Sequence, residues 1–343
     1  MPTVKDVAKL AGVAPITVSR VINNADYIRD DTRERVMAAI NQLGYVPNKV
    51  ARSLRSKQTS MLALVLTDIT NPFFTTVARG VEDTANAAGF NLILCNTDES
   101  KAKQDNYLQV LLERRVDGIL LVPARSNLEP VQLIQKMDIP VVVLDRQLPG
   151  HLADVVRCDS EDGAYQLTRL LIQNGHRQIT ILSGPPSVST AEDRVKGYQR
   201  ALREFGLELL NGSVYYGQFT SESGYQMTQQ ALNAIPRPTA LLAGNNFIAI
   251  GALKALKDFH LSVPEDIAVV GFDDLPSNIV VDPILTAAAQ PAYEMGRLGA
   301  ELLLARLDGK GPLDFQEIIL PVEIIVRQSS GTSLSEIPIT QQS

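Results

Sequence analysis

The N-terminal residues with the most informative chemistry are Pro15, Ile16, Thr17, Ser19 and Arg20, in the run PITVSRVI. They fall on one face of an expected short helix, because the remaining apolar residues of the run recur at helical spacing on the other face. An arginine so placed can pair with a guanine edge, and apolar side chains suit a thymine methyl. The pattern is typical of a helix that reads bases, although a plain helical hairpin with a solvated Arg20 also fits.

Further helices would position that face. Thr3 and Asp6 have the spacing of a capping box for a first helix, and Gly12 supplies the turn after it. Pro15 then stands in the first turn of the second helix, where its missing N–H costs nothing. Thr32–Leu43 is expected to be a third helix, with acidic residues near its N-terminus. Three such helices predict a helix-turn-helix headpiece.

Charge is distributed unevenly along the chain. The net charge is −6, yet residues 1–60 carry ten Lys and Arg against five Asp and Glu. The remainder therefore carries −11. A basic head on an acidic body suits phosphate contacts made by the head alone.

The basic segment PNKVARSLRSK follows the expected headpiece and lacks the apolar density of a core. By composition it is best interpreted as a solvated linker. It could also form one or two helical turns, since a short apolar face lies among its basic residues.

From Met61 onward, short apolar runs alternate with amphipathic stretches, two of which, Phe74–Gly89 and Lys103–Arg115, are expected to be helices. The apolar runs are MLALVL, NLILC, GILLVP, PVVVLD, ITILSG, TALLAG and IAVVGF. This alternation predicts parallel sheets with helices on both faces. There are too many units for one sheet, so we expect an α/β core of two doubly wound parallel-sheet lobes.

Polar and aromatic side chains follow several of these runs. They are Asp68, Asn71, Phe73, Asp145, Arg146, Asn245, Asn246, Asp273 and Asp274. Ligands of parallel sheets bind beyond the carboxyl ends of the strands. Carboxylates, amides and rings gathered there suit a polyhydroxylated ligand, whereas the alternative is that loop residues are polar anyway.

Other chemistries find little support. Only three histidines occur, none in a metal-spaced cluster, and there is no P-loop, GxSxG elbow or GxGxxG after a strand. We therefore expect no enzyme activity, no metal and no cofactor. Cys95 and Cys158 fit no zinc or disulfide framework and are expected to be reduced and buried. No apolar run is long enough for a membrane helix, and no signal region begins the chain, so a cytoplasmic protein is expected.

The chain as a whole resembles the LacI family of bacterial transcription regulators, from about Thr3 to Ser329. VKDVAKLAGVAPITVSRVINN and TRERVMAAINQLGYVPNKVARSLR are similar to that family's headpiece and hinge. Later matches are NPFF, RVDGIL, LDR, GHRQI, RVKGY, PTALLAGNN, VPEDIAVVGFDD and LPVEIIVRQS. The resemblance implies a repressor whose affinity for operator DNA is controlled by a small-molecule effector. It implies a homodimer on a pseudo-palindromic operator and a periplasmic-binding-protein-like core.

The resemblance also implies site residues. DNA contacts are expected from Thr3, Pro15, Ile16, Thr17, Ser19, Arg20, Asn23, Asn48, Ala51, Leu54 and Arg55. In the family, the hinge segment folds on DNA, with a leucine wedged into the minor groove at the position of Leu54. Effector contacts are expected from Asp68, Asn71, Phe73, Asp145, Arg146, Thr190, Arg194, Phe219, Asn245, Asp273 and Gln290.

The resemblance, together with the composition of each segment, predicts the domain boundaries. We expect a headpiece over residues 1–46, a hinge over 47–58 and a core over 59–329. Its N-lobe would comprise about 59–159 and 290–320, and its C-lobe about 160–289 and 321–329. The chain would cross between the lobes near Asp159, Gln290 and Pro321. Residues 330–343 are expected to be a disordered tail without the leucine heptads of a tetramer-forming coiled coil.

One position departs from the family pattern. Asn246 stands where the family usually has aspartate, so the pocket would lose a negative charge. That change predicts an effector that is a sugar acid or sugar phosphate as readily as a neutral sugar. Val188 stands where purine-binding members carry arginine, which argues against a purine. The competing hypothesis is a solute-binding protein without a regulatory role.

Overall fold

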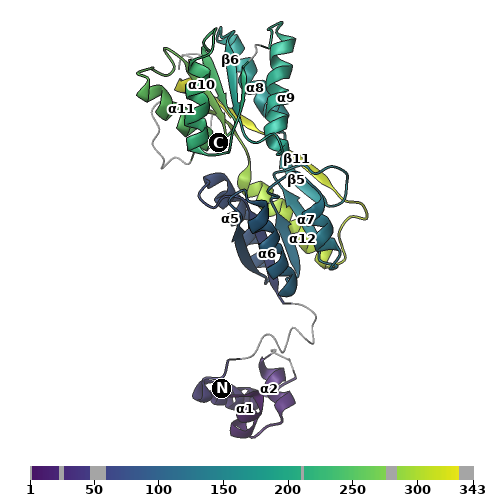
Figure 1. The fold of residues 1–343 in the computed structure, drawn as a ribbon. Helices are drawn as coiled ribbons and strands as arrows, with labels where there is room; N and C mark the ends of the chain where they lie inside the picture. Colours follow the sequence, from purple (N-terminus) through teal and green to yellow (C-terminus); the bar gives the residue numbers. More distant parts are fainter. Residues whose placement is uncertain (1, 23–26, 47–58, 210–211, 276–283, 332–343) are drawn as a thin grey trace, which may run out of the picture. The chain divides into compact units, whose positions relative to one another are not determined.

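The computed structural model describes residues 2–22, 27–46, 59–209, 212–275 and 284–331. The chain forms two compact units, Met1–Thr59 and Ser60–Ser343. Figure 1 shows a small helical unit at the N-terminus and a larger α/β unit. Each unit is described below by itself.

The N-terminal unit contains α1 (Val4–Ala11), α2 (Pro15–Ile22) and α3 (Asp30–Leu43). The predicted capping box is present, because the Thr3 backbone N–H donates to the Asp6 carboxylate over 2.8 Å and the Thr3 hydroxyl accepts from the Asp6 N–H. Gly12 ends α1 in the left-handed region, with φ of 65°, which a residue without Cβ adopts freely. Both predictions are confirmed.

The third helix begins two residues earlier than predicted, at Asp30. Two aspartates in the first turn favour this start, since they lie at the positive end of the helix dipole. Val7, Val18 and Val36, one from each helix, are fully buried in a shared core. Tyr45, which the helical pattern did not identify, is also buried there.

The first lobe of the larger unit has a six-stranded, all-parallel sheet in the order β11-β5-β4-β3-β1-β2. Its strands are β1 (Met61–Leu66), β2 (Asn91–Asn96), β3 (Gly118–Leu121), β4 (Val141–Leu144), β5 (Asp154–Cys158) and β11 (Glu317–Leu320). The helices α5 (Pro72–Ala87) and α12 (Ala292–Leu307) cover one face, and α6 (Lys101–Glu113) and α7 (Glu129–Gln135) cover the other. The buried apolar runs of the sequence are thus sandwiched on both faces.

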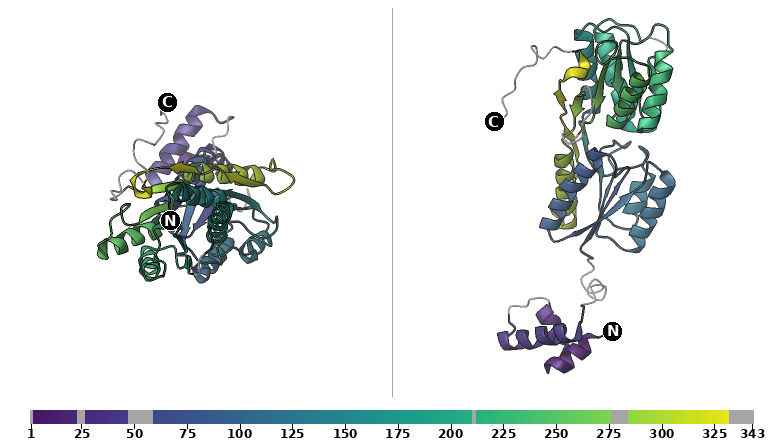
Figure 2. Two further views of the ribbon diagram at one scale, coloured as in Figure 1. Left: turned by 90° about the horizontal axis from the view of Figure 1, so that it is seen from above. Right: turned by 90° about the vertical axis from the view of Figure 1, so that its left-hand side faces the viewer.

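The second lobe has the strand order β12-β10-β9-β8-β6-β7. Its strands are β6 (Ile179–Ser183), β7 (Val214–Tyr216), β8 (Ala240–Ala243), β9 (Ala268–Phe272), β10 (Thr286–Ala289) and β12 (Glu323–Ile325). The helices α8 (Ser160–Gln173) and α9 (Ser189–Glu204) pack on one face, and α10 (Ser221–Leu232) and α11 (Asn246–Asp258) on the other. Figure 2 shows the two lobes in two further views.

The edge strand β12 is antiparallel to its neighbour, unlike the other pairs of this sheet. Glu323, its first residue, pairs with Ala289, the last residue of β10. The chain thus enters this sheet at the edge where the parallel strands end, so β12 runs in the direction opposite to those strands. The predicted pair of parallel-sheet lobes is confirmed, with β12 as an antiparallel edge strand of the second sheet.

Three connections join the lobes. They follow β5 at Asp159, β10 at Gln290 and Pro291, and β11 at Pro321 and Val322. Each leaves a strand at its carboxyl end. All three connections therefore lie at the edge of the sheets where ligands of this architecture bind.

Helix starts in the core differ from the sequence prediction by two residues. Helix α5 begins at Pro72 and α6 at Lys101, because Asn71 and Ser100 cap them through their side chains. The crossing of α5 with α12 depends on glycine. A Cβ at Gly80 would lie 2.1 Å from the backbone oxygen of Tyr293.

The predicted start of the disordered tail, residue 330, is too early in the sequence. Ser330 belongs to the short 3₁₀ helix η1 (Gln328–Ser330) and is fully buried. Its hydroxyl accepts from the Thr286 hydroxyl over 2.9 Å, and its carbonyl accepts from the Asn174 amide over 2.7 Å. These bonds extend the core beyond residue 329. Residues 332–343 lie outside the described part of the chain.

Candidate functional site: a helical reading face and an interlobe pocket

The exposed face of α2 carries the residues predicted to read bases. Pro15, Ile16 and Arg20 are exposed, with Ile16 at 51%, whereas Thr17 and Ser19 are half-buried. The Arg20 guanidinium lies 5.2 Å from the ring centroid of Tyr27. That contact, which the sequence pattern missed, holds the arginine by a cation–π interaction.

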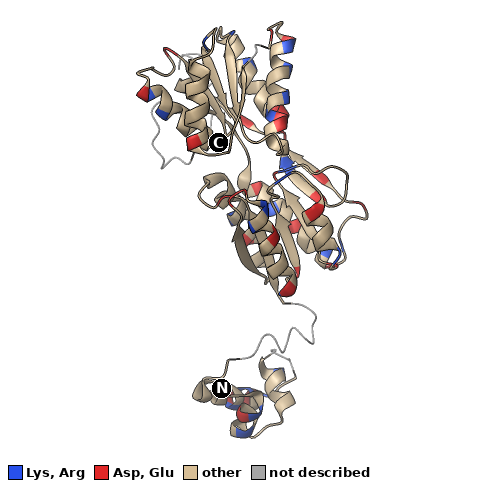
Figure 3. Ribbon diagram, viewed as in Figure 1, with Lys and Arg blue, Asp and Glu red and all other residues tan. Residues whose placement is uncertain are grey.

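Several predicted DNA contacts lie outside the described residues. They are Asn23, Asn48, Ala51, Leu54 and Arg55. Four of the ten basic residues of 1–60 also lie in 47–58. Figure 3 shows that acidic and basic residues occur together on the described headpiece helices. Much of the positive excess therefore belongs to the segment after the headpiece.

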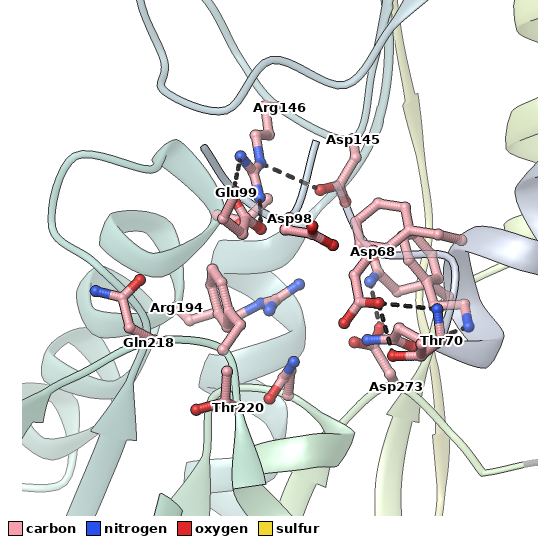
Figure 4. A pocket seen from close by; sticks show the side chains of 17 residues that line it. Asp68, Thr70, Asp98, Glu99, Asp145, Arg146, Arg194, Gln218, Thr220 and Asp273 are labelled. Atoms are coloured by element: carbon pink, nitrogen blue, oxygen red, sulfur yellow. Dashed lines mark hydrogen bonds and ion pairs between the residues drawn. The ribbon is translucent and has the colours of Figure 1, made fainter. Parts of the chain in front are cut away.

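A cavity of about 400 Å³ lies in the larger unit and is lined by residues of both lobes (Figure 4). All eleven residues predicted to contact an effector line it. They are Asp68, Asn71, Phe73, Asp145, Arg146, Thr190, Arg194, Phe219, Asn245, Asp273 and Gln290. The structure thus brings together, in one pocket, side chains that are up to 222 positions apart in the sequence.

Six further lining residues were missed by the sequence reasoning. They are Thr70, Phe74, Asp98, Glu99, Gln218 and Thr220. Asp98 and Glu99 follow β2, so the rule that polar residues after a strand mark the site would have found them. Gln218 and Thr220 flank Phe219 on the loop that leads to α10, where no strand pattern pointed to them.

Two aspartates occupy matching places in the two lobes. Asp145 follows β4 and Asp273 follows β9, and both have left-handed backbones, with φ of 66° and 65°. Their backbone N–H groups donate to Val156 and Ala288 on the next strand of the same sheet, over 2.9 and 3.0 Å. These bonds hold the aspartates in a conformation that few residues other than glycine adopt. Each carboxylate is thereby fixed at the pocket wall.

Burial raises the pKa of both carboxyl groups. Burial raises the pKa of Asp145 to about 6, although the charges of Arg146 and Arg194 act in the opposite direction. The pKa of Asp273 is also raised by burial, against the opposing charge of Arg194 and a hydrogen bond from Gln290. The ionised forms of these two carboxyl groups are therefore destabilised by burial, and hydrogen bonds donated by a ligand would stabilise them.

The two pocket arginines are held by the protein itself. Arg146 is 1% exposed, and its guanidinium binds both carboxylate oxygens of Glu99, over 2.9 and 2.5 Å. Arg194 lies 4.0 Å from the ring centroid of Phe272 and donates to the Gly244 carbonyl over 2.5 Å. The charge of Arg146 is therefore paired with a carboxylate of the protein, whereas the two contacts of Arg194 are to neutral groups.

Some polar atoms of the pocket still lack a partner among the described residues. Asp145 Oδ1 and Gln290 Oε1 are buried acceptors, and Arg194 Nε is a buried donor. Buried polar groups of this kind are normally satisfied. These atoms can bind a group that both donates and accepts hydrogen bonds.

Aromatic rings line the pocket beside these groups. Phe73 and Phe74 contact each other edge to face, with centroids 5.0 Å apart. Phe219 lies against Gly184, where an added Cβ would approach its ring to 2.2 Å. These rings provide an apolar surface beside the polar groups of the pocket.

The prediction for Asn246 is wrong. Its side chain is fully buried and does not line the pocket, since its amide pairs with that of Asn71 in the other lobe. Asparagine at this position therefore does not change the charge at the pocket wall, and it gives no support to an anionic effector. The pocket itself has five lining carboxylates against two arginines.

Cys95 and Cys158 are free and buried, as predicted. Across the described ranges there is no cluster of three or more His, Cys, Asp or Glu that could hold a metal ion. Within the same residues, no helix is long and apolar enough to cross a membrane.

Comparison with known proteins agrees with both units. Residues 3–48 match the family of bacterial regulatory proteins of the lacI type. Residues 59–323 match the family of periplasmic binding proteins and sugar-binding domains of the LacI family. The transcriptional repressor PurR of Photobacterium profundum is 36% identical over 330 residues, which cover 96% of this chain and 98% of that protein.

Solved structures agree as well. A complex of the regulator CelR with cellobiose is 33% identical, with a TM-score of 0.74 over 96% of this chain and all of that one. The lac repressor dimer bound to operator and the anti-inducer ONPF is 28% identical, with a TM-score of 0.83 over 96% and 99% of the two chains.

A helix-turn-helix unit joined to a two-lobed α/β core with an interlobe pocket defines a ligand-responsive DNA-binding regulator. The chain belongs to the LacI family of bacterial transcriptional regulators. It is a regulator of transcription and not an enzyme.

Proposed function

We propose that this protein is a repressor that binds a pseudo-palindromic operator as a homodimer and responds to a neutral sugar in the interlobe pocket. The observation that carries the proposal is the set of buried pocket atoms without a hydrogen-bond partner among the described residues: two acceptors, Asp145 Oδ1 and Gln290 Oε1, and two donors, the Nε atoms of Arg146 and Arg194. The hydroxyl groups of a sugar can donate to the two acceptors and accept from the two donors. A carboxylate or phosphate oxygen without a proton can only accept.

Charge supports the same choice. An anionic sugar would meet the carboxylates of Asp68, Asp98, Asp145 and Asp273, while Arg146 is already neutralised by Glu99. Like charges in a partly buried site repel strongly, because the effective dielectric constant is low. CelR, in its cellobiose complex, is a related protein with a neutral sugar, which is consistent with this ligand class.

The DNA half of the proposal rests on α2 and its neighbours. Pro15, Ile16 and Arg20 form an exposed face on a short helix, where the first residues of a recognition helix touch base edges. The lac repressor of the related structure is a dimer on its operator. A two-fold dimer would require two half-sites related by symmetry, and operator binding would place the protein in the cytoplasm.

Two experiments test operator binding and effector binding separately. Deleting residues 1–60 should abolish operator binding and preserve the ligand response, whereas a solute-binding protein without a regulatory role would bind no operator even at full length. A thermal-shift screen should compare neutral mono- and disaccharides with sugar acids, sugar phosphates and purines. A ligand at 100 times its dissociation constant adds about 2.7 kcal/mol. A response to sugar phosphates alone would contradict the neutral-ligand proposal.

A further inference from the structure

Asn71 and Asn246 form a reciprocal pair of amides between the two lobes. The Asn71 Nδ2 donates to Asn246 Oδ1 over 3.1 Å, and the Asn246 Nδ2 donates to Asn71 Oδ1 over 3.0 Å. Asn71 is 4% exposed and Asn246 is fully buried. We propose that this pair, here called the amide clasp, holds the two lobes in the arrangement described here and so positions the walls of the pocket.

The clasp joins the N-terminal ends of two helices that pack on different sheets. Asn71 is the N-cap of α5, and Asn246 is the first residue of α11. Both elements lead directly into the pocket, because Asn71 and Phe73 line it from one lobe and Asn245 from the other. A change in the clasp would therefore move both walls of the pocket relative to each other.

The orientation of the Asn71 amide is fixed by its own helix. Its Oδ1 accepts the Phe73 backbone N–H over 3.0 Å, which is the capping bond of α5. Rotating the Asn71 amide by 180° would break that capping bond. Asn71 therefore presents two groups to position 246: its Nδ2 as a donor and its Oδ1 as an acceptor. The partner at position 246 must then accept and donate side by side. An amide does both, whereas an ionised carboxylate only accepts.

This requirement explains the asparagine at position 246 without reference to effector charge. Aspartate would keep the bond from Asn71 Nδ2 but would place an acceptor against Asn71 Oδ1. The clasp is made of neutral groups, so salt should affect it little.

Polar contacts also join the lobes elsewhere. The Ser189 hydroxyl accepts the Gln147 backbone N–H over 2.8 Å, the Ser126 hydroxyl accepts the Ser189 N–H over 2.8 Å, and the Ser126 N–H donates to Ser187. Each of these three bonds has a backbone N–H as its donor, two of them are accepted by serine hydroxyls, and none involves Asn71 or Asn246. The clasp depends on two side chains and can be removed without altering the backbone contacts.

The test measures the distance between the lobes in the full-length protein without ligand or DNA. Cysteine replaces Met137 in the first lobe and Ile235 in the second, because these side chains are 55% and 98% exposed. The two cysteines are spin-labelled for pulsed electron–electron double resonance. Cys95 and Cys158 are buried and compete little for label. Because no ligand is present, the result does not depend on the proposed effector.

Asn71→Ser is the decisive variant, since serine caps helices as well as asparagine does but is too short to reach Asn246. We expect a longer-distance population in Asn71→Ser, in Asn246→Ala and in Asn246→Asp. The double variant Asn71→Ser, Asn246→Ala should match the single variants rather than add to them, because one pair is lost in each case.

The matched control is Asn174→Ala, which removes an amide hydrogen bond to Ser330 inside the second lobe. It should lower thermal stability and leave the distance distribution unchanged. The proposal is overturned if Asn71→Ser and Asn246→Ala both retain the parent distribution, or if the control shifts it equally. A parent-like distribution in Asn246→Asp would overturn the requirement for an amide.

Discussion

Replacing Asp145 with asparagine should stabilise the ligand-free protein. Burial raises the pKa of Asp145 from 3.8 to about 6, a change of roughly two units, and each unit corresponds to about 1.4 kcal/mol. The ionised carboxylate therefore destabilises the core by about 3 kcal/mol at neutral pH. Asparagine has the same shape and tolerates the left-handed backbone of this position, with its φ of 66°.

The pH dependence gives the sign of the effect. A carboxyl group whose pKa is raised on folding favours the folded state while it is protonated, so its penalty is complete above about pH 6. The penalty becomes small as the pH falls from 6 toward 4 and disappears well below 3.8, where the group is protonated in both states. The stability advantage of Asp145→Asn over the parent should therefore be largest at pH 7.5 and small at pH 4.

Thermal unfolding at the two pH values is the assay. A gain of 1 kcal/mol raises Tm by about 2–4 °C in domains of 150–250 residues, so a rise of about 6–12 °C is expected at pH 7.5. Asp138→Asn is the matched control, because Asp138 has a φ of 55° in the same lobe but is exposed. A variant less stable than the parent at pH 7.5, or an advantage independent of pH, would refute the reasoning. The same variant should lose the thermal shift that a neutral sugar produces.

Three further predictions concern the core. Glu99→Gln should lower the free energy of unfolding by about 3 kcal/mol, measured in urea, because the buried Arg146 guanidinium loses the carboxylate that its terminal nitrogens bind and keeps only the 3.8 Å contact with Asp145; an unchanged midpoint would contradict this. Gly80→Ala should prevent the close crossing of α5 and α12, since its Cβ would lie 2.1 Å from a backbone oxygen, and soluble expression or cooperative unfolding should be lost. Cys95 and Cys158 should react with a thiol reagent only after denaturant is added, because both are buried; rapid reaction in buffer would show that these sites open.

Sequence patterns located the pocket because its chemistry is tied to strand ends. Asp145 and Asp273 each follow a short apolar run, and the carboxyl ends of parallel strands must meet at one edge. The helix boundaries were less accurate, since Asn71 and Ser100 act as caps two residues before the predicted starts. Capping depends on a side-chain rotamer, which apolar periodicity does not contain.

The partners of these side chains could not be predicted from the sequence. Asn246 was assigned to the pocket because it follows a strand, but its amide turns toward Asn71, which lies 175 positions earlier. Arg146 was expected to contact the effector, and it lines the pocket, yet its charge is already balanced by Glu99. In both cases the deciding contact is made between elements that fold together only in the tertiary structure.

The pocket of this protein combines features that are unfavourable for folding. Asp145 and Asp273 have left-handed backbones, raised pKa values and, in Asp145, an unpartnered buried oxygen. Each of these features lowers stability while the pocket is empty. A hydroxylated ligand that donates to both lobes would relieve part of the cost in each, and the relief depends on the distance between the lobes. Ligand binding and lobe arrangement are therefore linked by the same hydrogen bonds, which is the free-energy coupling that a regulator needs.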